Sequence, residues 1–208
     1  MAFWPNPGLA WKPEDFDFDR DYKRVGVAES FYSPTNPDLR RFKGAGGKLI
    51  SYVGWNDAGG APLAVVDYYE TAERTMGGRA RTQAFFRLFA VPGMDHCGDG
   101  GDGAFAVDWL SALEAWVEHG DPPDRLIGSH VRLSNPKVDF EGVRLRFPLD
   151  PSRVEFSRPL YPYPLGTKYL GHGDSSSPAS FGPVELSIDT SSSYGGGRGQ
   201  QSGISTIE

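Results

Sequence analysis

Cysteine is almost absent from this sequence, and long apolar runs and an excess of basic residues are lacking altogether. The one cysteine, Cys97, excludes a disulfide within the chain and a zinc site built from several cysteines. No window holds the ~18 consecutive apolar residues of a membrane span, and no basic stretch leads into an apolar one near Met1. We therefore expect neither a transmembrane helix nor a signal peptide. With 21 Lys+Arg against 27 Asp+Glu, the net charge of −6 disfavours nucleic acid as a partner.

The chain length of 208 residues suits one domain with its own core. Its 27 glycines and 17 prolines predict many loops. Near the C-terminus, Ser, Gly and Gln dominate, and this composition buries too little apolar area to offset the entropy cost of ordering the chain. We expect an α/β portion in residues 1–130, an appended region in 131–186 and a disordered tail in 187–208.

Two compact apolar runs, residues 48–53 and 85–91, are typical of buried strands. Between them, apolar residues recur every three or four positions from Pro62 to Met76, which predicts an amphipathic helix ending at the following glycines. A second helical period begins at Ala106 and stops before Gly120. Strand and helix in alternation predict a parallel sheet covered by helices, so the fold class is α/β.

Two further segments alternate polar and apolar residues. Residues 130–133 and 143–147 read as strands of an appended hairpin around a turn at Asn135-Pro136. Residues 15–19 alternate Asp and Phe, and because Asp is a poor strand former we predict an extended surface segment there.

Chemically competent side chains follow each of the two buried strands. Asp57 lies in the glycine-rich turn after the first strand, and His96 follows the second. Parallel strands joined by one crossover helix place their C-terminal loops side by side, so we expect these residues to touch. An Asp that accepts the Nδ1 proton of a His orients the imidazole as a general base for a nucleophile. Trp55, beside Asp57, is the aromatic residue that we place nearest a substrate ring.

A nucleophile for this pair is missing from the sequence. In α/β-hydrolases the triad runs in the chain order Ser, acid, His, and Asp57 followed by His96 fits its last two members. The Ser of such enzymes lies in a G-x-S-x-G turn, and no such motif occurs here. We therefore expect the acid and the base of a triad without its serine.

The run Pro92-Gly93-Met94-Asp95-His96-Cys97 has the pattern Pro-Gly-Met-x-His-Cys. With this especially specific block, residues 11–130 resemble the tannase and feruloyl esterase family of serine esterases. A weaker likeness covers 158–171. The blocks that carry the likeness are Gly46-Gly47-Lys48-Leu49-Ile50, Gly54-Trp55-Asn56-Asp57, Asp67-Tyr68-Tyr69-Glu70, Met76-Gly77-Gly78, Phe86-Arg87-Leu88-Phe89 and Val91-Pro92-Gly93-Met94-Asp95-His96-Cys97.

The resemblance implies part of an α/β-hydrolase sheet, with Asp57 as triad acid, His96 as general base and an aromatic-acid ester as substrate. It also implies that Cys97 corresponds to a cysteine that is disulfide-bonded beside the nucleophilic Ser. The family's calcium site and most of its substrate specificity lie in a lid that we find no match for, so we expect no cofactor in this chain. The family is mostly secreted or periplasmic, and we expect that location here.

Simpler interpretations stand beside these. Asp is common in glycine-rich turns because its side chain hydrogen-bonds its own backbone. A lone Cys97 is either a buried small hydrophobe or an exposed thiol, and for Trp55 a packing role is favoured over a substrate contact. Asp residues around 95–108 lack the spacing of a calcium loop. The other histidines, 119, 130 and 172, show no ligand spacing and are predicted at the surface.

Three hypotheses follow for the whole chain. It is a fragment of a secreted esterase whose nucleophile is encoded upstream, or a pseudoenzyme acting as a binding module, or one subunit of a split hydrolase completed by a partner that carries the Ser. In each case we expect the isolated chain to be inactive, because a general base without a positioned nucleophile gives only background hydrolysis.

Overall fold

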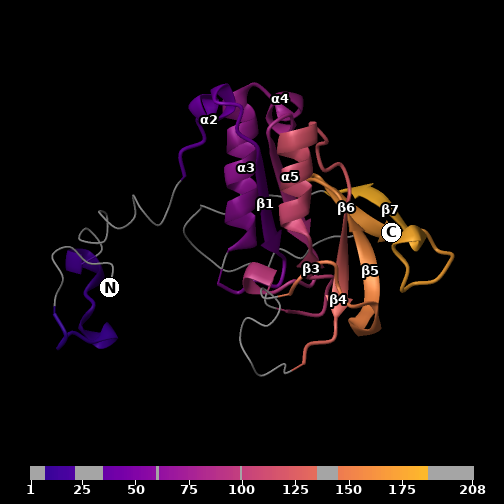
Figure 1. Cartoon of the computed structure of the whole chain (residues 1–208). Helices are drawn as coiled ribbons and strands as arrows, with labels where there is room; N and C mark the ends of the chain where they lie inside the picture. Colours follow the sequence, from indigo (N-terminus) through magenta and orange to yellow (C-terminus); the bar gives the residue numbers. More distant parts are fainter. Residues whose placement is uncertain (1–7, 22–34, 60, 99, 135–144, 187–208) are drawn as a thin grey trace. The chain divides into compact units, whose positions relative to one another are not determined.

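The computed structural model describes residues 8–21, 35–59, 61–98, 100–134 and 145–186 (Figure 1). The chain divides into two units, residues 1–36 and 37–208, and each is described by itself. The expected tail 187–208 and the expected turn at Asn135-Pro136 lie outside the described residues. None of the described helices has the length and apolar character needed to span a membrane.

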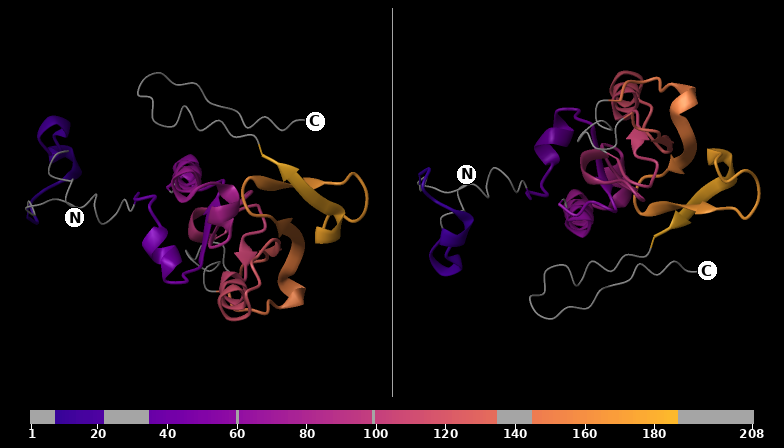
Figure 2. Two further views of the ribbon diagram at one scale, coloured as in Figure 1. Left: turned by 90° about the horizontal axis from the view of Figure 1, so that it is seen from above. Right: turned by 90° about the horizontal axis from the view of Figure 1, so that it is seen from below.

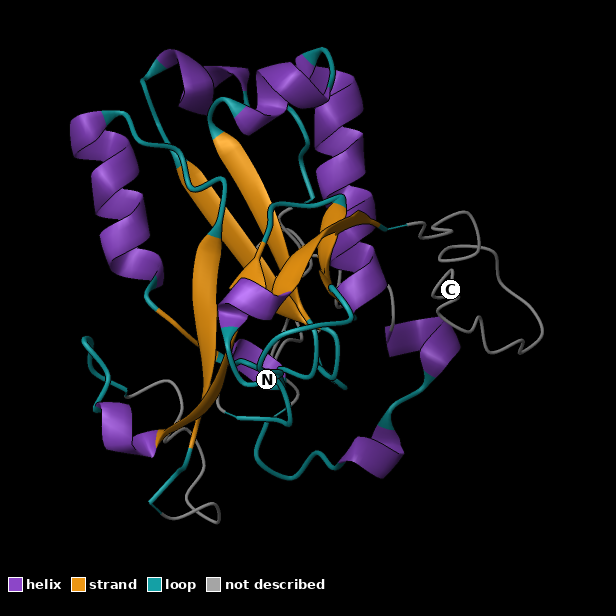
Figure 3. Ribbon diagram, turned by 90° about the vertical axis from the view of Figure 1, so that its right-hand side faces the viewer, coloured by secondary structure: helices purple, strands orange, loops and turns teal. Residues whose placement is uncertain are grey.

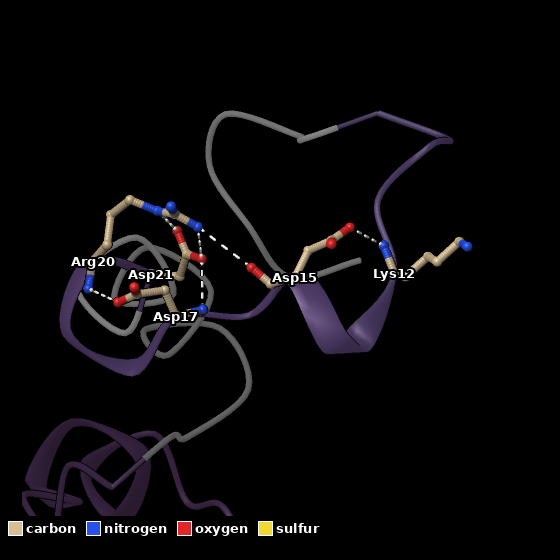
Figure 4. Close-up of polar contacts among 5 residues, drawn as sticks. All are labelled: Lys12, Asp15, Asp17, Arg20 and Asp21. Atoms are coloured by element: carbon tan, nitrogen blue, oxygen red, sulfur yellow. Dashed lines mark hydrogen bonds and ion pairs between the residues drawn. The ribbon is translucent and has the colours of Figure 1, made fainter.

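Short-range hydrogen bonds of acidic residues organise the described part of the first unit (Figure 4). A 3-10 turn, η1 (Pro13–Asp15), begins where the Asp15 carboxylate accepts from the backbone N–H of Lys12 at 2.9 Å. Asp17 accepts from the Arg20 N–H at 2.9 Å, and the Arg20 guanidinium donates to both oxygens of Asp21. The extended segment predicted for 15–19 is therefore wrong, because these carboxylates satisfy local backbone donors and stabilise turns instead.

The second unit begins with the predicted strand–helix–strand pattern. After a short helix, α2 (Arg40–Gly44), come β1 (Leu49–Gly54), α3 (Pro62–Met76), a short α4 (Arg79–Gln83) and β2 (Phe86–Val91). β1 and β2 are parallel, with Leu49 opposite Phe86 and Gly54 opposite Val91. α3 has Pro62 in its first turn and ends at Gly77 in the left-handed conformation (φ 90°), as the sequence predicts.

Helices cover both faces of this strand pair (Figure 3). Phe86 and Leu88 of β2 pack with Tyr69 and the other buried residues of α3. The alternate residues of β2, Phe89 and Val91, belong to a second cluster that includes Trp109 of α5. Because successive side chains of a strand point to opposite faces, each face of β1–β2 is buried under its own helix. The α/β class is thereby confirmed.

The second helix begins later than its apolar period predicts. Ala106 and Val107 form a two-residue strand, β3, and α5 spans Trp109–His119. Asp108 caps the helix by accepting from the Ser111 N–H at 3.1 Å. An Asp that caps a helix N-terminus marks its start, so the apolar residues before it belong to the sheet.

The C-terminal part of the unit differs from the predicted hairpin (Figure 2). β4 (Leu126–Val131) pairs antiparallel with β3 and with β5 (Val154–Leu160), and the described residues 145–147 form no strand. The hairpin of 130–133 with 143–147 is therefore wrong. A different hairpin, β6 (Leu165–Tyr169) with β7 (Phe181–Glu185), packs beside β5. Short 3-10 turns, η4 (Pro151–Arg153) and η5 (Pro178–Ser180), precede β5 and β7.

Candidate active site

The loop after β1 carries Asp57 and is held by backbone hydrogen bonds. The Asn56 N–H donates to the Met94 carbonyl at 3.1 Å, and the Asp57 N–H donates to the Gly54 carbonyl at 3.2 Å. Gly54 is required at the strand end, because a Cβ there would lie 2.1 Å from the Met94 oxygen. The β1 loop thus lies directly against the loop that follows β2.

The loop after β2 carries His96 and turns sharply. His96 opens the 3-10 turn η2 (His96–Gly98), within which Cys97 adopts a left-handed conformation with φ of 53°. For a residue with a Cβ this conformation is uncommon and strained. Such strain is frequent where a side chain is presented from a tight turn.

Asp57 and His96 meet where the two loops meet. Asp57 Oδ2 lies 2.8 Å from His96 Nδ1, and Asp57 Oδ1 accepts from the Gly59 N–H at 2.8 Å. The Asp57 side chain is 7% exposed and the His96 side chain 57%. A carboxylate accepts only, so Nδ1 carries the proton, and in the neutral ring Nε2 keeps the lone pair of a general base. A buried, doubly hydrogen-bonded carboxylate therefore orients an imidazole that is open to reactants.

Aromatic side chains border the His96 turn. Tyr52 stacks on Trp109 with ring centroids 4.6 Å apart and an interplanar angle of 4°, and its hydroxyl donates to the Cys97 carbonyl at 3.5 Å. Partial burial raises the pKa of the Tyr52 hydroxyl, and the electrostatic interaction with the Cys97 side chain adds to the rise. Of the two interpretations of Cys97, the structure has the exposed free thiol.

Other residues singled out from the sequence lie elsewhere. Trp55 is half-buried and packs against the core cluster that contains Val53 and the buried residues of α3. The structure therefore gives Trp55 contacts in the core. Within the described ranges, no three His, Cys, Asp or Glu side chains are placed to hold a metal ion.

His130 is not the surface residue that its isolated position predicts. Its side chain is only 22% exposed, and Nδ1 donates to the Gly103 carbonyl at 2.9 Å. The surface prediction rested on the lack of ligand spacing, and sequence reasoning missed that the long-range partner β5 places Phe156 opposite His130.

In this site, the C-terminal loops of two parallel strands bring a carboxylate to an imidazole. The same arrangement is found in triad hydrolases. The family model for tannase and feruloyl esterase matches residues 9–184, and the chain belongs to this family. It is 35% identical over 185 residues to mono(2-hydroxyethyl) terephthalate hydrolase of Piscinibacter sakaiensis, covering 85% of this chain and 28% of that protein. A probable feruloyl esterase of Arthroderma benhamiae is 34% identical, covering 71% of this chain and 24% of that protein.

A solved structure is similar in fold as well. Feruloyl esterase B from Aspergillus oryzae superimposes with a TM-score of 0.63 and 26% identity, covering 84% of this chain and 34% of that one. The chain thus spans about a third or less of the length of these relatives.

Proposed function

We propose that this chain supplies the acid and the general base of a serine ester hydrolase acting on aromatic-acid esters. Asp57 is the triad acid and His96 the base, and the nucleophilic serine comes from outside these 208 residues. The observation that carries the proposal is the 2.8 Å contact between the buried Asp57 carboxylate and Nδ1 of the open His96 ring.

In the proposed reaction, His96 Nε2 removes the proton from the serine hydroxyl as its oxygen attacks the ester carbonyl. Asp57 stabilises the imidazolium that forms and keeps the ring in place. His96 then gives the proton to the leaving alcohol, and an acyl-enzyme remains. In the second half, His96 takes a proton from water as the water oxygen attacks the acyl carbon. It returns that proton to the serine oxygen as the acyl–serine bond breaks, and the aromatic acid is released. Backbone amides beside the serine would stabilise the oxyanion of each tetrahedral intermediate.

Two observations support a nucleophile that lies outside this chain. No G-x-S-x-G occurs in the chain, and among the described side chains only Asp57 hydrogen-bonds His96. The unit 37–208 would then be part of an α/β-hydrolase sheet, and Cys97 would form a disulfide with a cysteine beside the serine. We also propose a secreted or periplasmic location, as for most of the family.

The names of the relatives support the proposed substrate class. One acts on mono(2-hydroxyethyl) terephthalate and another is named for feruloyl esters, and both names describe an aromatic acid in ester linkage. The alcohol portion differs between them, so the shared chemistry is the aromatic acyl group. Methyl ferulate and mono(2-hydroxyethyl) terephthalate are the corresponding probes.

A chimera tests the proposal. Residues 37–186 replace the matching segment of the Piscinibacter hydrolase, which supplies the serine, and hydrolysis of both probes is measured. We expect turnover that falls about a thousandfold or more in His96→Ala and in Asp57→Asn, because each removes a member of the triad. His119→Ala, an exposed histidine at the end of α5, is the matched control and should retain full turnover.

The outcomes separate the hypotheses. Turnover that survives both His96→Ala and Asp57→Asn would overturn the assignment of these residues. A folded chimera that binds ester without forming an acyl-enzyme would favour a non-catalytic binding module.

A further inference from the structure

We propose that His130 is a positioning residue for the His96 loop, acting through the backbone of Gly103. This inference rests on the proposed function for its catalytic meaning, but its structural part stands without it. His130 lies on β4 and donates from Nδ1 to the Gly103 carbonyl at 2.9 Å. The Gly103 N–H in turn donates to the Gly93 carbonyl at 2.8 Å, and Gly93 begins the turn that presents His96.

The segment 100–103 contacts the turn before His96 through backbone atoms. A Cβ on Gly103 would lie 1.9 Å from the Pro92 oxygen, and one on Gly101 would lie 2.2 Å from the Gly93 oxygen. The Asp95 N–H also donates to the Gly100 carbonyl at 3.0 Å, one residue before His96. No side chain separates the segment 100–103 from the turn that precedes His96. A shift of residues 100–103 is therefore transmitted directly to the His96 turn.

The His96 turn is therefore held from two sides. The Asp57 loop contacts it through the Asn56 N–H and the Met94 carbonyl, and the segment 100–103 contacts it through Gly93 and Asp95. The first of these sides also supplies the catalytic acid. Within the described segment 100–103, no side chain hydrogen-bonds His96. This segment is itself held by the hydrogen bond from His130 to the Gly103 carbonyl.

Aromatic rings lock His130 in the orientation that this bond needs. Its ring stacks on Phe156 of β5 at 4.9 Å with an interplanar angle of 9°, and Phe105 meets it edge-on at 5.4 Å. A carbonyl oxygen only accepts, so Nδ1 is protonated whether or not Nε2 also is. Glu155 Oε2 lies 3.6 Å from Nε2, and the Arg132 guanidinium binds the same carboxylate. These two charged groups face the ring, and the donated bond is the same in either ring charge state.

The stack continues into the C-terminal hairpin. The Arg158 guanidinium lies between the rings of Phe156 and Phe181, at 4.4 and 4.2 Å from their centroids. Burial lowers the pKa of Arg158. Phe181 belongs to β7, so this series of stacked side chains connects the β6–β7 hairpin to His130. The hairpin therefore supports the ring that positions the candidate active-site turn.

The test uses the full chain and nuclear magnetic resonance, so it needs no nucleophile. His130→Phe keeps a flat ring for stacking and removes the donor. His130→Asn keeps a donor as many bonds from Cα as Nδ1, and His130→Gln moves the donor one bond further. His172→Phe is the matched control, since the exposed His172 also bonds a backbone carbonyl, that of Leu170, at 3.2 Å. Two signals are read: amide exchange of Gly103, and the low-field proton on His96 Nδ1.

We expect Gly103 amide exchange to accelerate about tenfold in His130→Phe, because one hydrogen bond that holds the segment 100–103 is lost. The His96 Nδ1 proton should broaden in the same variant. His130→Asn should restore both signals to within about twofold, and His172→Phe should leave them unchanged. Amides of β1 and β2 serve as the check that each variant is folded. If His130→Phe fails this check, His130→Gln takes its place and is expected to show the same two changes.

Unchanged exchange and an unchanged His96 signal in folded His130→Phe or His130→Gln would overturn the inference. So would loss of both signals in His130→Asn to the same extent as in His130→Phe, since the ring and not the donor would then matter. In the active chimera, His130→Phe should lower kcat about tenfold and change KM less than twofold. A chimera without any turnover counts against the proposed function and leaves the magnetic resonance result to decide on His130.

Discussion

At the scale of single residues, Asp57 and His96 differ in their exposure to solvent. The carboxylate is 7% exposed and both of its oxygens accept hydrogen bonds, whereas the imidazole is 57% exposed. Burial of a charge is costly unless donors compensate it, and here the Gly59 N–H and the imidazole N–H are those donors. In the proposed triad, the acid is therefore fixed while the base remains accessible, which is the arrangement that proton transfer needs.

A second buried carboxylate, Glu73 of α3, is compensated only in part. Its Oε1 accepts no hydrogen bond from the described residues, although the Arg79 Nε lies 3.4 Å away. Burial raises the pKa of Glu73, and Arg79 opposes the rise. A carboxyl group with a raised folded-state pKa costs no stability at low pH. It destabilises the fold as pH rises through its unfolded value, because only the unfolded chain ionises freely.

Glu73→Gln should therefore raise the thermal midpoint at pH 8, and the gain over the natural chain should shrink at pH 4. Thermal unfolding followed by circular dichroism at the two pH values measures this. Glu118→Gln, on an exposed position of α5, is the control and should change little at either pH. A midpoint lowered at pH 8 and unaltered at pH 4 would mean that pairing with Arg79 outweighs the cost of burial.

At the scale of elements, the candidate site forms where the C-terminal ends of β1 and β2 lie side by side. β1 and β2 are in register from Leu49–Phe86 to Gly54–Val91, so their loops leave the sheet at the same level. Gly54 lets the loops approach to backbone contact, since a Cβ there would lie 2.1 Å from the Met94 oxygen. The Asp57–His96 distance is thus a consequence of strand register and of one missing side chain.

Gly54→Ala should destabilise the fold by about 1–3 kcal/mol, because the added methyl group forces the two loops apart. Gly44→Ala is the matched control: Gly44 lies in α2 with nothing within 4 Å of the added Cβ. That change should leave stability equal or raise it by up to about 1 kcal/mol. Urea unfolding measures both variants. Equal stabilities for the two would show that the loops separate without cost.

The sequence predicted those elements whose cause is local. The strands β1 and β2, their parallel pairing and the helix Pro62–Met76 follow from apolar period, Pro62 and Gly77, all within the segments concerned. The start of α5 was missed, although Asp108 as a capping residue offered a local signal. The pairing of β4 with β5 could not be predicted from local sequence, because the two strands are far apart along the chain. The contact of Asp57 with His96 could be anticipated, and that of His130 with Gly103 could not.

At the scale of the whole molecule, the proposed function assigns an acid and a base to this chain and places the nucleophile that they activate outside it. The relatives that it matches are considerably longer, since it covers only 28% of one and 34% of another. Binding and a general base alone give little rate enhancement when the positioned nucleophile is missing. Activity would then depend on a serine that another segment or another polypeptide provides.

The isolated chain should accordingly hydrolyse methyl ferulate at the background rate of buffer. His96→Ala should not change that rate, because the imidazole has no serine to deprotonate. Release of ferulic acid, followed by absorbance over hours at high protein concentration, measures this. Turnover by the isolated chain that disappears in His96→Ala would show that a nucleophile is present within these residues.

The most direct test of the central claim reads the protonation of the His96 ring itself. Nitrogen-15 magnetic resonance of the full chain distinguishes the two neutral tautomers of each histidine. We predict that His96 carries its proton on Nδ1, hydrogen-bonded to Asp57, and that Asp57→Asn abolishes this preference. A His96 ring protonated on Nε2, or one that averages freely and is indifferent to Asp57→Asn, would contradict the account.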